Sequence, residues 1–250
     1  MTDFAAYKES FPHAKLSRSA EGVLEMRFHS NGKTLTFDAA THEEFVDLFH
    51  VVGQDLETRV VIMTGTGDAF IDNIDGSKFD FGTAEGFFKM FQEGRRVLAN
   101  LVDIPVPVIA AVNGPATVHS EYILLSDVVL ATPETVFQDK PHAAFGIVPG
   151  DGIHSLWPHV IGSVRGRYFV FTQQVLSVED AKAYGAVNEI VPRDQLLTRA
   201  HQIAAKIAAL SPLTARLTRI AVTQPFRRLL EESVGYGLTL ETLSAVLAKR

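Results

Sequence analysis

A histidine and an aspartate, His142 and Asp151, lie nine residues apart in one glycine-containing segment. A neutral imidazole can accept a proton from water because its pKa lies near neutral pH. A carboxylate on the other ring nitrogen fixes the tautomer and stabilises the imidazolium that forms. Gly146, Pro149 and Gly150 lie between the two residues, so the chain can turn back and bring them together. The pair therefore has the residue types of a water-activating dyad.

The same two residues also allow an ordinary structural role. His142 can satisfy a hydrogen bond of its loop, and Asp151 can cap a helix that begins near Gly152, because aspartate is a favoured N-cap. On these residues alone, both interpretations remain open.

Other kinds of active site lack the residues that they need. The chain has no cysteine, which excludes a cysteine nucleophile, thiolate metal sites and disulfides. Its nine histidines include no pair at the i, i+4 spacing of a zinc helix, and no Gly-x-Ser-x-Gly sequence occurs. Gly65 and Gly67 lack the third glycine and the acidic residue of a dinucleotide site. The sequence therefore predicts neither a metal nor a cofactor.

The bulk composition is that of an ordinary globular protein. The chain has 250 residues, of which 46% are hydrophobic and 21% charged, enough for one large domain or one domain with an appendage. Its net charge is −6 and its basic residues are scattered, which argues against binding to nucleic acid or an anionic membrane. We find no secretory signal, and the longest apolar stretches, such as residues 106–112, are too short to span a membrane. We expect a cytoplasmic protein with a small-molecule partner.

Short apolar stretches that suit strands alternate with helical patterns along the first part of the chain. Strands are expected at residues 22–28, 59–64, 107–112 and 127–131. Helices are expected at residues 45–52 and 84–102, and Pro115 suits the first turn of another helix. This alternation is typical of α/β proteins with buried, mostly parallel strands. From residue 178 onward the pattern is helical, with helices expected at 196–210, 212–228 and 231–249.

Four segments share their order and spacing with a known superfamily. They read Gly-Thr-Gly-Asp-Ala-Phe at 65–70, Pro-Val-Ile-Ala-Ala-Val-Asn-Gly-Pro-Ala at 107–116, Ser-Asp-Val-Val-Leu-Ala at 126–131, and Gly-Ile-Val-Pro-Gly-Asp-Gly at 146–152. Together they resemble the crotonase (enoyl-CoA hydratase/isomerase) superfamily over residues 22–191. The resemblance implies a crotonase fold of the α/β class, a spiral of ββα units with a helical C-terminal region. It places a spiral core at residues 1–195 and a helical trimerisation region at 196–250.

The departures from that superfamily concern its acidic positions. Hydratases have a glutamate after the proline that is Pro141 here, where this chain has His142. A small residue between two glycines has become Asp151, and the glycine run with its glutamate is replaced by Thr-Val-His-Ser-Glu at 117–121. This pattern is similar to that of 6-oxocamphor hydrolase and related β-diketone hydrolases. Further segments support that similarity: Phe-Gln-Asp at 137–139, Trp-Pro-His-Val at 157–160, Arg-Gly-Arg-Tyr-Phe at 165–169 and Tyr-Gly-Ala-Val-Asn-Glu at 184–189.

The resemblance implies a hydrolase that cleaves a carbon–carbon bond of a (bi)cyclic 1,3-diketone by a retro-Claisen reaction and releases a keto acid. His142 and Asp151 match the catalytic pair, His119 matches the carbonyl-binding histidine, and Glu241 matches an active-site glutamate. A tryptophan that helps to hold the carbonyl in those hydrolases is Phe37 here, which has no N–H to donate. The implied assembly is a homotrimer or a dimer of trimers.

Several residues have a structural alternative beside the role that the resemblance gives them. The backbone N–H of Ile74 matches an oxyanion donor, and aromatic residues fit either the wall of an apolar pocket or the core: Phe37, Phe81, Phe88 and Trp157. Glu241 lies on a mostly apolar helix face, which allows a buried, an exposed or an interfacial position. His119 can instead cap a helix as a buried histidine.

Two other functions compete with the hydrolase. An enoyl-CoA hydratase or isomerase that acts on an acyl-CoA thioester is the common activity of the superfamily, and Lys33 or Lys78 could contribute to phosphate binding. A non-catalytic crotonase homologue would show no pH-dependent turnover.

Overall fold

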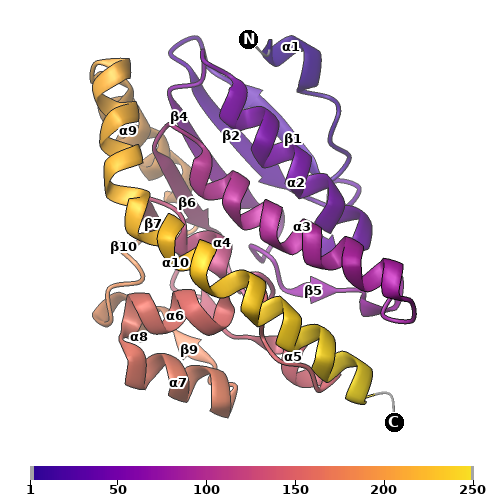
Figure 1. Ribbon diagram of the computed structural model, residues 1–250. Helices are drawn as coiled ribbons and strands as arrows, with labels where there is room; N and C mark the ends of the chain where they lie inside the picture. The colour runs from indigo at the N-terminus through magenta and orange to yellow at the C-terminus, as the bar shows by residue number, and fades with distance from the viewer. Residues whose placement is uncertain (1–2, 249–250) are drawn as a thin grey trace.

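The computed structural model describes residues 3–248, and a six-stranded sheet runs through its centre (Figure 1). Its strands lie in the order β1 (Ala14–Arg18), β2 (Val23–Phe28), β4 (Val60–Gly65), β6 (Val108–Val112), β7 (Val128–Ala131) and β10 (Glu189–Ile190). β1 is antiparallel to β2, and every other neighbouring pair is parallel. The strands expected from apolar stretches are therefore confirmed, as is their mostly parallel pairing.

The central strands are apolar on both sides because both faces of the sheet are covered. In β4, Val61 and Met63 pack into one core cluster, whereas Val60 and Ile62 pack into a second cluster on the opposite face. The first cluster includes side chains of α2 (Ala39–Gln54) and α3 (Ala84–Asp103), and the second includes those of α9 (Leu196–Ala208). Buried parallel strands of this kind have continuous apolar sequences rather than alternating ones.

Shorter elements connect the sheet to the loops that carry polar side chains. Two small sheets pair β3 (Thr36–Phe37) with β5 (Asn73–Ile74), and β8 (Val136–Phe137) with β9 (Leu176–Ser177). The shorter helices are α1 (Phe4–Tyr7), the 3-10 helix η1 (Gly76–Lys78), α4 (Glu121–Leu124), α5 (Lys140–Phe145), α6 (Ile153–Ile161), α7 (Ser163–Thr172) and α8 (Val178–Ala183). Among residues 3–248, no helix combines the length and the apolar character needed to cross a membrane.

The motifs at residues 65–70 and 107–116 meet through the side chain of Asn113. Its Oδ1 accepts the N–H of Gly65, and its Nδ2 donates to the carbonyls of Gly67 and Ala69. Gly114 has a φ of 154°, and a β-carbon there would lie 1.9 Å from the carbonyl oxygen of Asp68. Only glycine fits this contact, which holds together the two loops that lead to β5 and to His119.

Two expectations about helices are wrong. Pro115 does not open a helix, because Ala116 forms β-bridges with Ile71 and Phe137, and the next helix, α4, begins only at Glu121. The patterns at 212–228 and 231–249 are not two helices, since α10 (Pro212–Ala248) is continuous through Pro225. α10 packs against α3 and α6 and so runs along the α/β core (Figure 1).

A buried arginine joins α10 to the core. Arg219 is 2% exposed, and its Nε donates to the carboxylate of Asp127 at 2.7 Å. Its guanidinium also donates to the backbone carbonyls of Val102, Ile104 and Leu125. Arg219 thus supplies donors to the C-terminal end of α3 and to the segment before β7.

Replacing Arg219 by alanine should lower the free energy of unfolding by about 3 kcal/mol, because the buried carbonyls of Val102 and Ile104 lose their donor and the partly exposed carboxylate of Asp127 loses its partner. Urea denaturation followed by circular dichroism measures this change. Arg228 lies on the same helix, is exposed and forms no contact of this kind, so Arg228→Ala should change the stability by less than about 0.5 kcal/mol. Equal losses in the two variants would contradict the role of Arg219.

Candidate active site

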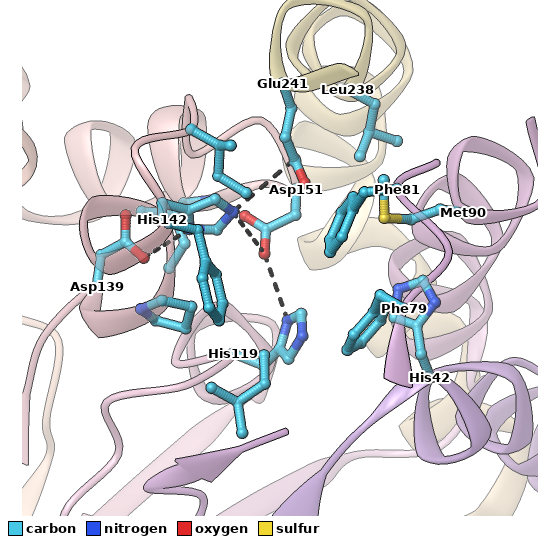
Figure 2. A pocket seen from close by; sticks show the side chains of 15 residues that line it. His42, Phe79, Phe81, Met90, His119, Asp139, His142, Asp151, Leu238 and Glu241 are labelled. Atoms are coloured by element: carbon cyan, nitrogen blue, oxygen red, sulfur yellow. Dashed lines mark hydrogen bonds and ion pairs between the residues drawn. The ribbon is translucent and has the colours of Figure 1, made fainter. Parts of the chain in front are cut away.

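A pocket lies where α2, α3, α5, α10 and the loop before α4 meet (Figure 2). Three histidines and three carboxylates face it among apolar side chains; its lining consists of His42, Ile74, Phe79, Phe81, Met90, His119, Asp139, Pro141, His142, Phe145, Ile147, Asp151, Ile153, Leu238 and Glu241. An adjoining hollow of about 210 Å³ shares Phe81, Phe145 and Ile147 with it. An apolar pocket with a few converging polar groups is typical of a small-molecule site.

His142 is held between two carboxylates on opposite ring nitrogens. It lies on α5, is 6% exposed, and its Nδ1 is 2.6 Å from Oδ1 of Asp139. Its Nε2 is 3.6 Å from Oδ2 of Asp151 and 3.8 Å from Oε2 of Glu241. We expected Asp151 in the orienting position, but in the structure Asp139, one helical turn before His142, makes the short Nδ1 contact. Asp151 instead lies on the Nε2 side, which faces the pocket.

Asp151 joins the two predicted histidines. Besides its contact with His142, its Oδ2 is 3.4 Å from Nδ1 of His119. Its other oxygen is 3.5 Å from the N–H of Ile153, the first residue of α6, so capping of that helix is weak. The carboxylate therefore lies at similar distances from the two histidines and from the first N–H of α6.

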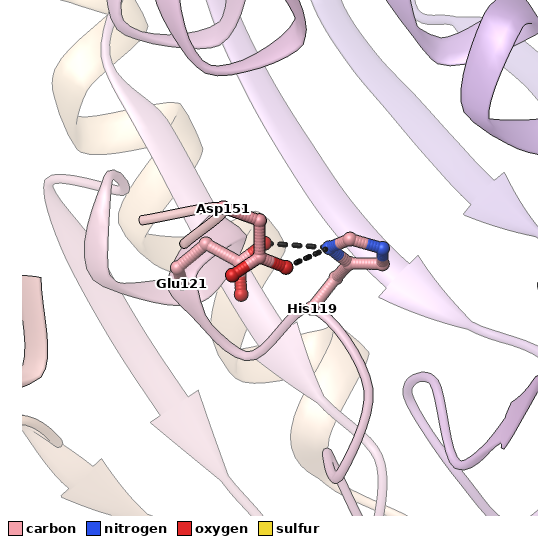
Figure 3. A group of neighbouring side chains, drawn as sticks. All are labelled: His119, Glu121 and Asp151. Carbon is pink, nitrogen blue, oxygen red and sulfur yellow. Dashed lines mark hydrogen bonds and ion pairs between the residues drawn. The ribbon is translucent and has the colours of Figure 1, made fainter. Parts of the chain in front are cut away.

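His119 has an unusual backbone and a fully occupied Nδ1. Its φ of 49° lies in the left-handed region, which costs a residue with a β-carbon about 1–2 kcal/mol. Its ring stacks on Tyr122 with centroids 5.0 Å apart and lies 4.2 Å from the ring of Phe37. Nδ1 is 2.6 Å from Oε1 of Glu121, whereas Nε2 has no partner among the described residues (Figure 3). The free nitrogen is thus available to a ligand.

Glu121 is a site residue that the sequence analysis did not assign. It is fully buried, and its Oε2 has no hydrogen-bond partner among residues 3–248. His119, Glu121 and Asp151 each offer one possible metal-ligand atom, and these atoms lie within 4.8 Å of one another. The short bond between Nδ1 of His119 and Glu121 already occupies two of those atoms. The cluster therefore fits a histidine–carboxylate pair at least as well as a metal site, and the absence of a metal stays a prediction.

Glu241 reaches the pocket from α10 because that helix lies very close to the loop before α6. A β-carbon on Gly237 would lie 2.4 Å from the carbonyl oxygen of Gly150, so glycine permits the contact. Two turns further along, the hydroxyl of Ser244 accepts the N–H of Val148. Glu241 is 5% exposed, and its Oε2 has no hydrogen-bond partner within the described chain. Of the buried, exposed and interfacial positions that the sequence allowed for Glu241, the structure shows the buried one, which suits the predicted site.

The charges in the pocket shift the pKa of His142 and of its neighbours. Burial alone would lower the pKa of His142, but the charge of Asp151, the hydrogen bond and charge of Asp139, and Glu241 raise it to about 10. Burial would likewise raise the pKa of Asp151, but the charges of His142 and His119 bring it below its usual value. Burial raises the pKa of Glu241 to about 8, so this side chain is largely a neutral acid at pH 7.

The pKa values of the second pair, His119 and Glu121, are shifted in a similar way. Burial opposes the charged form of His119, but the charge and hydrogen bond of Glu121 and the charge of Asp151 raise its pKa above the usual value. Burial, together with the charge of Asp151, raises the pKa of Glu121 to about 7. A raised pKa favours the imidazolium form of His119, which donates from both nitrogens.

The structure brings some of the predicted substrate-binding residues to the pocket and leaves others outside. Ile74 and Phe81 line it, and Phe37 is fully buried behind the ring of His119. The prediction is wrong for Phe88, which is 63% exposed on the outer face of α3, and for Trp157. Trp157 is buried in the core, where its Nε1 donates to Ser120, so its N–H has a structural partner.

Two further residues of the pocket escaped the sequence analysis, although each had a signal. Asp139 lies three residues before His142, a spacing that brings side chains together on one helix turn. His42 lies three residues before Phe45, so it shares the apolar face of the predicted helix if that helix is extended by one turn, as it is in α2. A polar residue on such a face needs a buried partner. Its partner, Glu93, is 51 residues away in the sequence.

Comparisons with known proteins show which family this chain resembles. A family model described as enoyl-CoA hydratase/isomerase matches residues 18–242. The short-chain-enoyl-CoA hydratase of Clostridium acetobutylicum is 30% identical over 193 residues, which cover 75% of this chain and 73% of that protein. Among solved structures, an enoyl-CoA hydratase from Bacillus anthracis is 25% identical, with a TM-score of 0.76 over 94% of this chain and 91% of that chain.

A second solved structure is more similar. A β-diketone hydrolase from the cyanobacterium Anabaena sp. PCC 7120, bound to (S)-3-oxocyclohexyl acetic acid, is 46% identical. The TM-score is 0.96, and the match covers 98% of both chains. The predicted crotonase fold of the α/β class is thereby confirmed.

Proposed function

This chain belongs to the enoyl-CoA hydratase/isomerase family, and from that premise we propose that it is a β-diketone hydrolase which cleaves a carbon–carbon bond of a cyclic or bicyclic 1,3-diketone. The observation that carries the proposal is the placement of His142: its Nδ1 is bound by Asp139, and its Nε2 faces the pocket beside Asp151. The 46% identity to a β-diketone hydrolase over nearly the whole chain supports it.

In the proposed first step, His142 deprotonates a water molecule. With Asp139 ionised, the proton of the neutral ring resides on Nδ1, so the lone pair on Nε2 can accept a proton from water. Asp151 accepts the second hydrogen of the same water and stabilises the imidazolium that forms. The hydroxide oxygen bonds to the carbon of one carbonyl group, whose oxygen becomes an oxyanion. The backbone N–H of Ile74 is the proposed donor to that oxyanion.

In the second step the carbon–carbon bond breaks. Its electron pair moves to the other carbonyl group, which becomes an enolate, and His119 donates to the enolate oxygen from Nε2. The imidazolium of His142 returns its proton to the enolate carbon, so the elements of one water molecule are added and a keto acid is formed. Because Glu241 beside Asp151 is a neutral acid, it adds no second negative charge next to the departing enolate.

The proposed substrates are diketones that cannot enolise between the two carbonyls, because the carbon there is fully substituted or is a bridgehead. In such compounds neither carbonyl group is converted to an enol at that carbon, so both remain open to attack by water. The ligand of the similar hydrolase, an oxocyclohexyl acetic acid, is a keto acid of the kind that cleavage of a bridged bicyclic diketone would release. The apolar side chains Ile74, Phe79, Phe81 and Leu238 suit the carbocyclic part of such a molecule.

A substrate panel tests the proposal. Cyclic and bicyclic 1,3-diketones are incubated with the protein, and the keto acid is identified by mass spectrometry; enoyl-CoA thioesters are assayed in parallel. We expect diketone cleavage, which persists after dialysis against EDTA. Consumption of thioesters alone, with micromolar binding of a CoA thioester in calorimetry, would favour the hydratase activity. No turnover of either class would indicate a non-catalytic protein.

The pH dependence of catalysis should reflect the raised pKa of His142. At pH 7 a histidine with a pKa of about 10 is mostly imidazolium, and its base form increases about tenfold with each pH unit. We therefore expect kcat/KM to rise from pH 7 to pH 9, measured with a diketone that does not itself ionise. Circular dichroism at each pH controls for unfolding. A plateau already at pH 7.5, or a rate independent of pH, would contradict this assignment of the base.

The assembly is proposed to be a homotrimer or a dimer of trimers, as the family resemblance implies. α7 and α10 carry large apolar side chains that the single chain leaves exposed: Val164, Tyr168, Phe171, Leu213, Leu217, Ile220, Val222, Tyr236, Leu243 and Leu247. Exposed apolar surface of this extent is typical of protein–protein contacts.

A further inference from the structure

An apolar hollow adjoins the active-site pocket beside the C-terminal ends of α5 and α10. Its volume is about 210 Å³, against about 50 Å³ for the pocket itself, so most of the free space at the site lies in the hollow. Within residues 3–248 only apolar residues line it, namely Gly76, Phe81, Phe145, Ile147, Ala245 and Ala248. A polar group would lose its hydrogen bonds to water there, so the hollow favours an apolar occupant.

Three side chains line both spaces and so connect them. Phe81, Phe145 and Ile147 belong to the pocket and to the hollow alike. A ligand held in the pocket can therefore extend into the hollow while it stays in contact with the protein. Phe145 and Ala248 are exposed to solvent, so a ligand in the hollow would remove their apolar surface from water, which is favourable.

The hollow lies at the end of the site where water is proposed to attack. Phe145 follows His142 by three residues on α5, and Ala245 follows Glu241 by one turn on α10, spacings at which side chains share a helix face. His119, the proposed donor to the enolate oxygen, lines the pocket but not the hollow. Figure 2 shows Glu241 and His119 on opposite sides of the pocket. A group in the hollow is therefore nearer to the carbonyl that water attacks than to the ketone that is kept.

Small residues keep the hollow open on two sides. On α10, a leucine or phenylalanine in place of Ala245 or Ala248 would occupy part of the space. On η1, the ring of Phe145 lies directly against Gly76, where a β-carbon would be 2.4 Å from Cζ of that ring. Any larger residue at position 76 would displace the ring, so glycine permits its present position. The width of the hollow is thus set by residues that take no part in the proposed chemistry.

We propose that the hollow binds an alkyl substituent of the substrate, carried on the carbon next to the carbonyl that water attacks, on the side of the bond that is kept. The inference rests on the proposed function and narrows its substrate class to cyclic 1,3-diketones with an apolar side chain at that carbon. Their cleavage gives keto acids that are branched at the carbon bearing the carboxyl group. Phe145, Ala245 and Ala248 determine how large the side chain can be. Each methylene group buried in the hollow should raise the affinity about fourfold.

A series of product-like ligands tests the inference. Its members are 3-oxocyclohexyl acetic acid and the same acid with an ethyl or a butyl group on the carbon that carries the carboxyl group, used as separated stereoisomers. Calorimetry with the wild-type protein should show that the affinity rises along the series for at least one stereoisomer, by about fourfold for each methylene group buried. If the butyl acid binds no more tightly than the unsubstituted acid in any stereoisomer, the inference is overturned.

Filling the hollow should remove the preference for the longer side chain. In Ala248→Phe we expect the ratio of the affinities of the butyl and the unsubstituted acid to fall about tenfold or more. Ala248 is exposed, so the larger side chain need not disturb the core. Ala144 is exposed on α5 and lines neither space, so Ala144→Phe is the matched control and should keep the wild-type ratio. An unchanged ratio in Ala248→Phe, or an equal fall in both variants, would contradict the assignment of the hollow.

The outcomes separate the inference from the function on which it rests. If the wild-type protein cleaves diketones but shows no preference for the alkyl acids, the role of the hollow is refuted and the hydrolase assignment stands. If it binds the acids with the expected preference but cleaves no diketone, the hollow binds as proposed and the assigned reaction fails. If it neither cleaves a diketone nor binds any of the acids, the proposed function fails and the inference fails with it.

Discussion

Replacing His142 by alanine is expected to lower kcat for diketone hydrolysis by about 10²–10⁴-fold, because the variant has no base within reach of the water. Asp151 cannot take over this task, since its lowered pKa makes it a poor proton acceptor at neutral pH. Single-turnover measurements with a cleavable diketone isolate the chemical step from product release.

The fold of this variant should persist, because His142 lies on the short helix α5 and contacts the pocket rather than the sheet. Circular dichroism and the thermal midpoint check this. A wild-type value of kcat in a folded His142→Ala protein would show that another group activates the water. Partial recovery of the rate on adding imidazole would support the assignment.

Exchanging Asp139 for asparagine should be almost as damaging, with kcat lowered by up to about 10⁴-fold, as in Ser-His-Asp triads whose aspartate is changed in this way. The amide N–H₂ of asparagine can donate to Nδ1 of His142 and move the ring proton to Nε2, where it blocks acceptance from water. Asp151→Asn keeps the correct tautomer of His142, since Asp139 still accepts the hydrogen bond from Nδ1. This variant should therefore lower kcat less than Asp139→Asn does.

The two variants also differ from the wild type in their pH dependence. Both remove a negative charge that raises the pKa of His142, so the rise of kcat/KM should move to lower pH in each. The ranking of kcat is the decisive result. If Asp151→Asn is the more damaging change, the orienting role belongs to Asp151, as the sequence alone suggested.

The sequence predicted the central strands well because their signal is local. Strands β4 and β6 are continuous apolar stretches, and both faces of each are buried, so tertiary packing and local pattern agree. The two-residue strands β3, β5, β8 and β9 have no periodicity of their own and exist only through their pairing. Pro115 has the chemistry of a helix start, yet pairing of Ala116 with Ile71 and Phe137 prevents a helix there.

Candidate site residues were predictable where a departure from the family pattern marked them. His142, Asp151 and His119 occupy positions that depart from the hydratase pattern, and they meet at the pocket together with Glu241, whose position the sequence left open. The sequence did not reveal which side chains form hydrogen bonds and ion pairs with these residues, because such partners are brought together only by the three-dimensional fold. Asp151 lies near both histidines, directly before Gly152, whose φ of 113° is in the left-handed region. Phe88 and Trp157 were misplaced because an aromatic residue in a helix gives no sign of which face is buried.

The docking of α10 has a consequence for the order of events during protein synthesis. The sheet and the helices α2 to α9 precede α10 in the chain, so they are synthesised before it. Until α10 packs along α3 and places Gly237 against Gly150, the pocket lacks Glu241 and Leu238. A nascent chain still attached to the ribosome would then hold His119, His142 and Asp151 open to bulk water, whose high dielectric weakens their mutual interactions. Catalytic competence would thus depend on the docking of α10, which closes over side chains supplied by earlier parts of the chain.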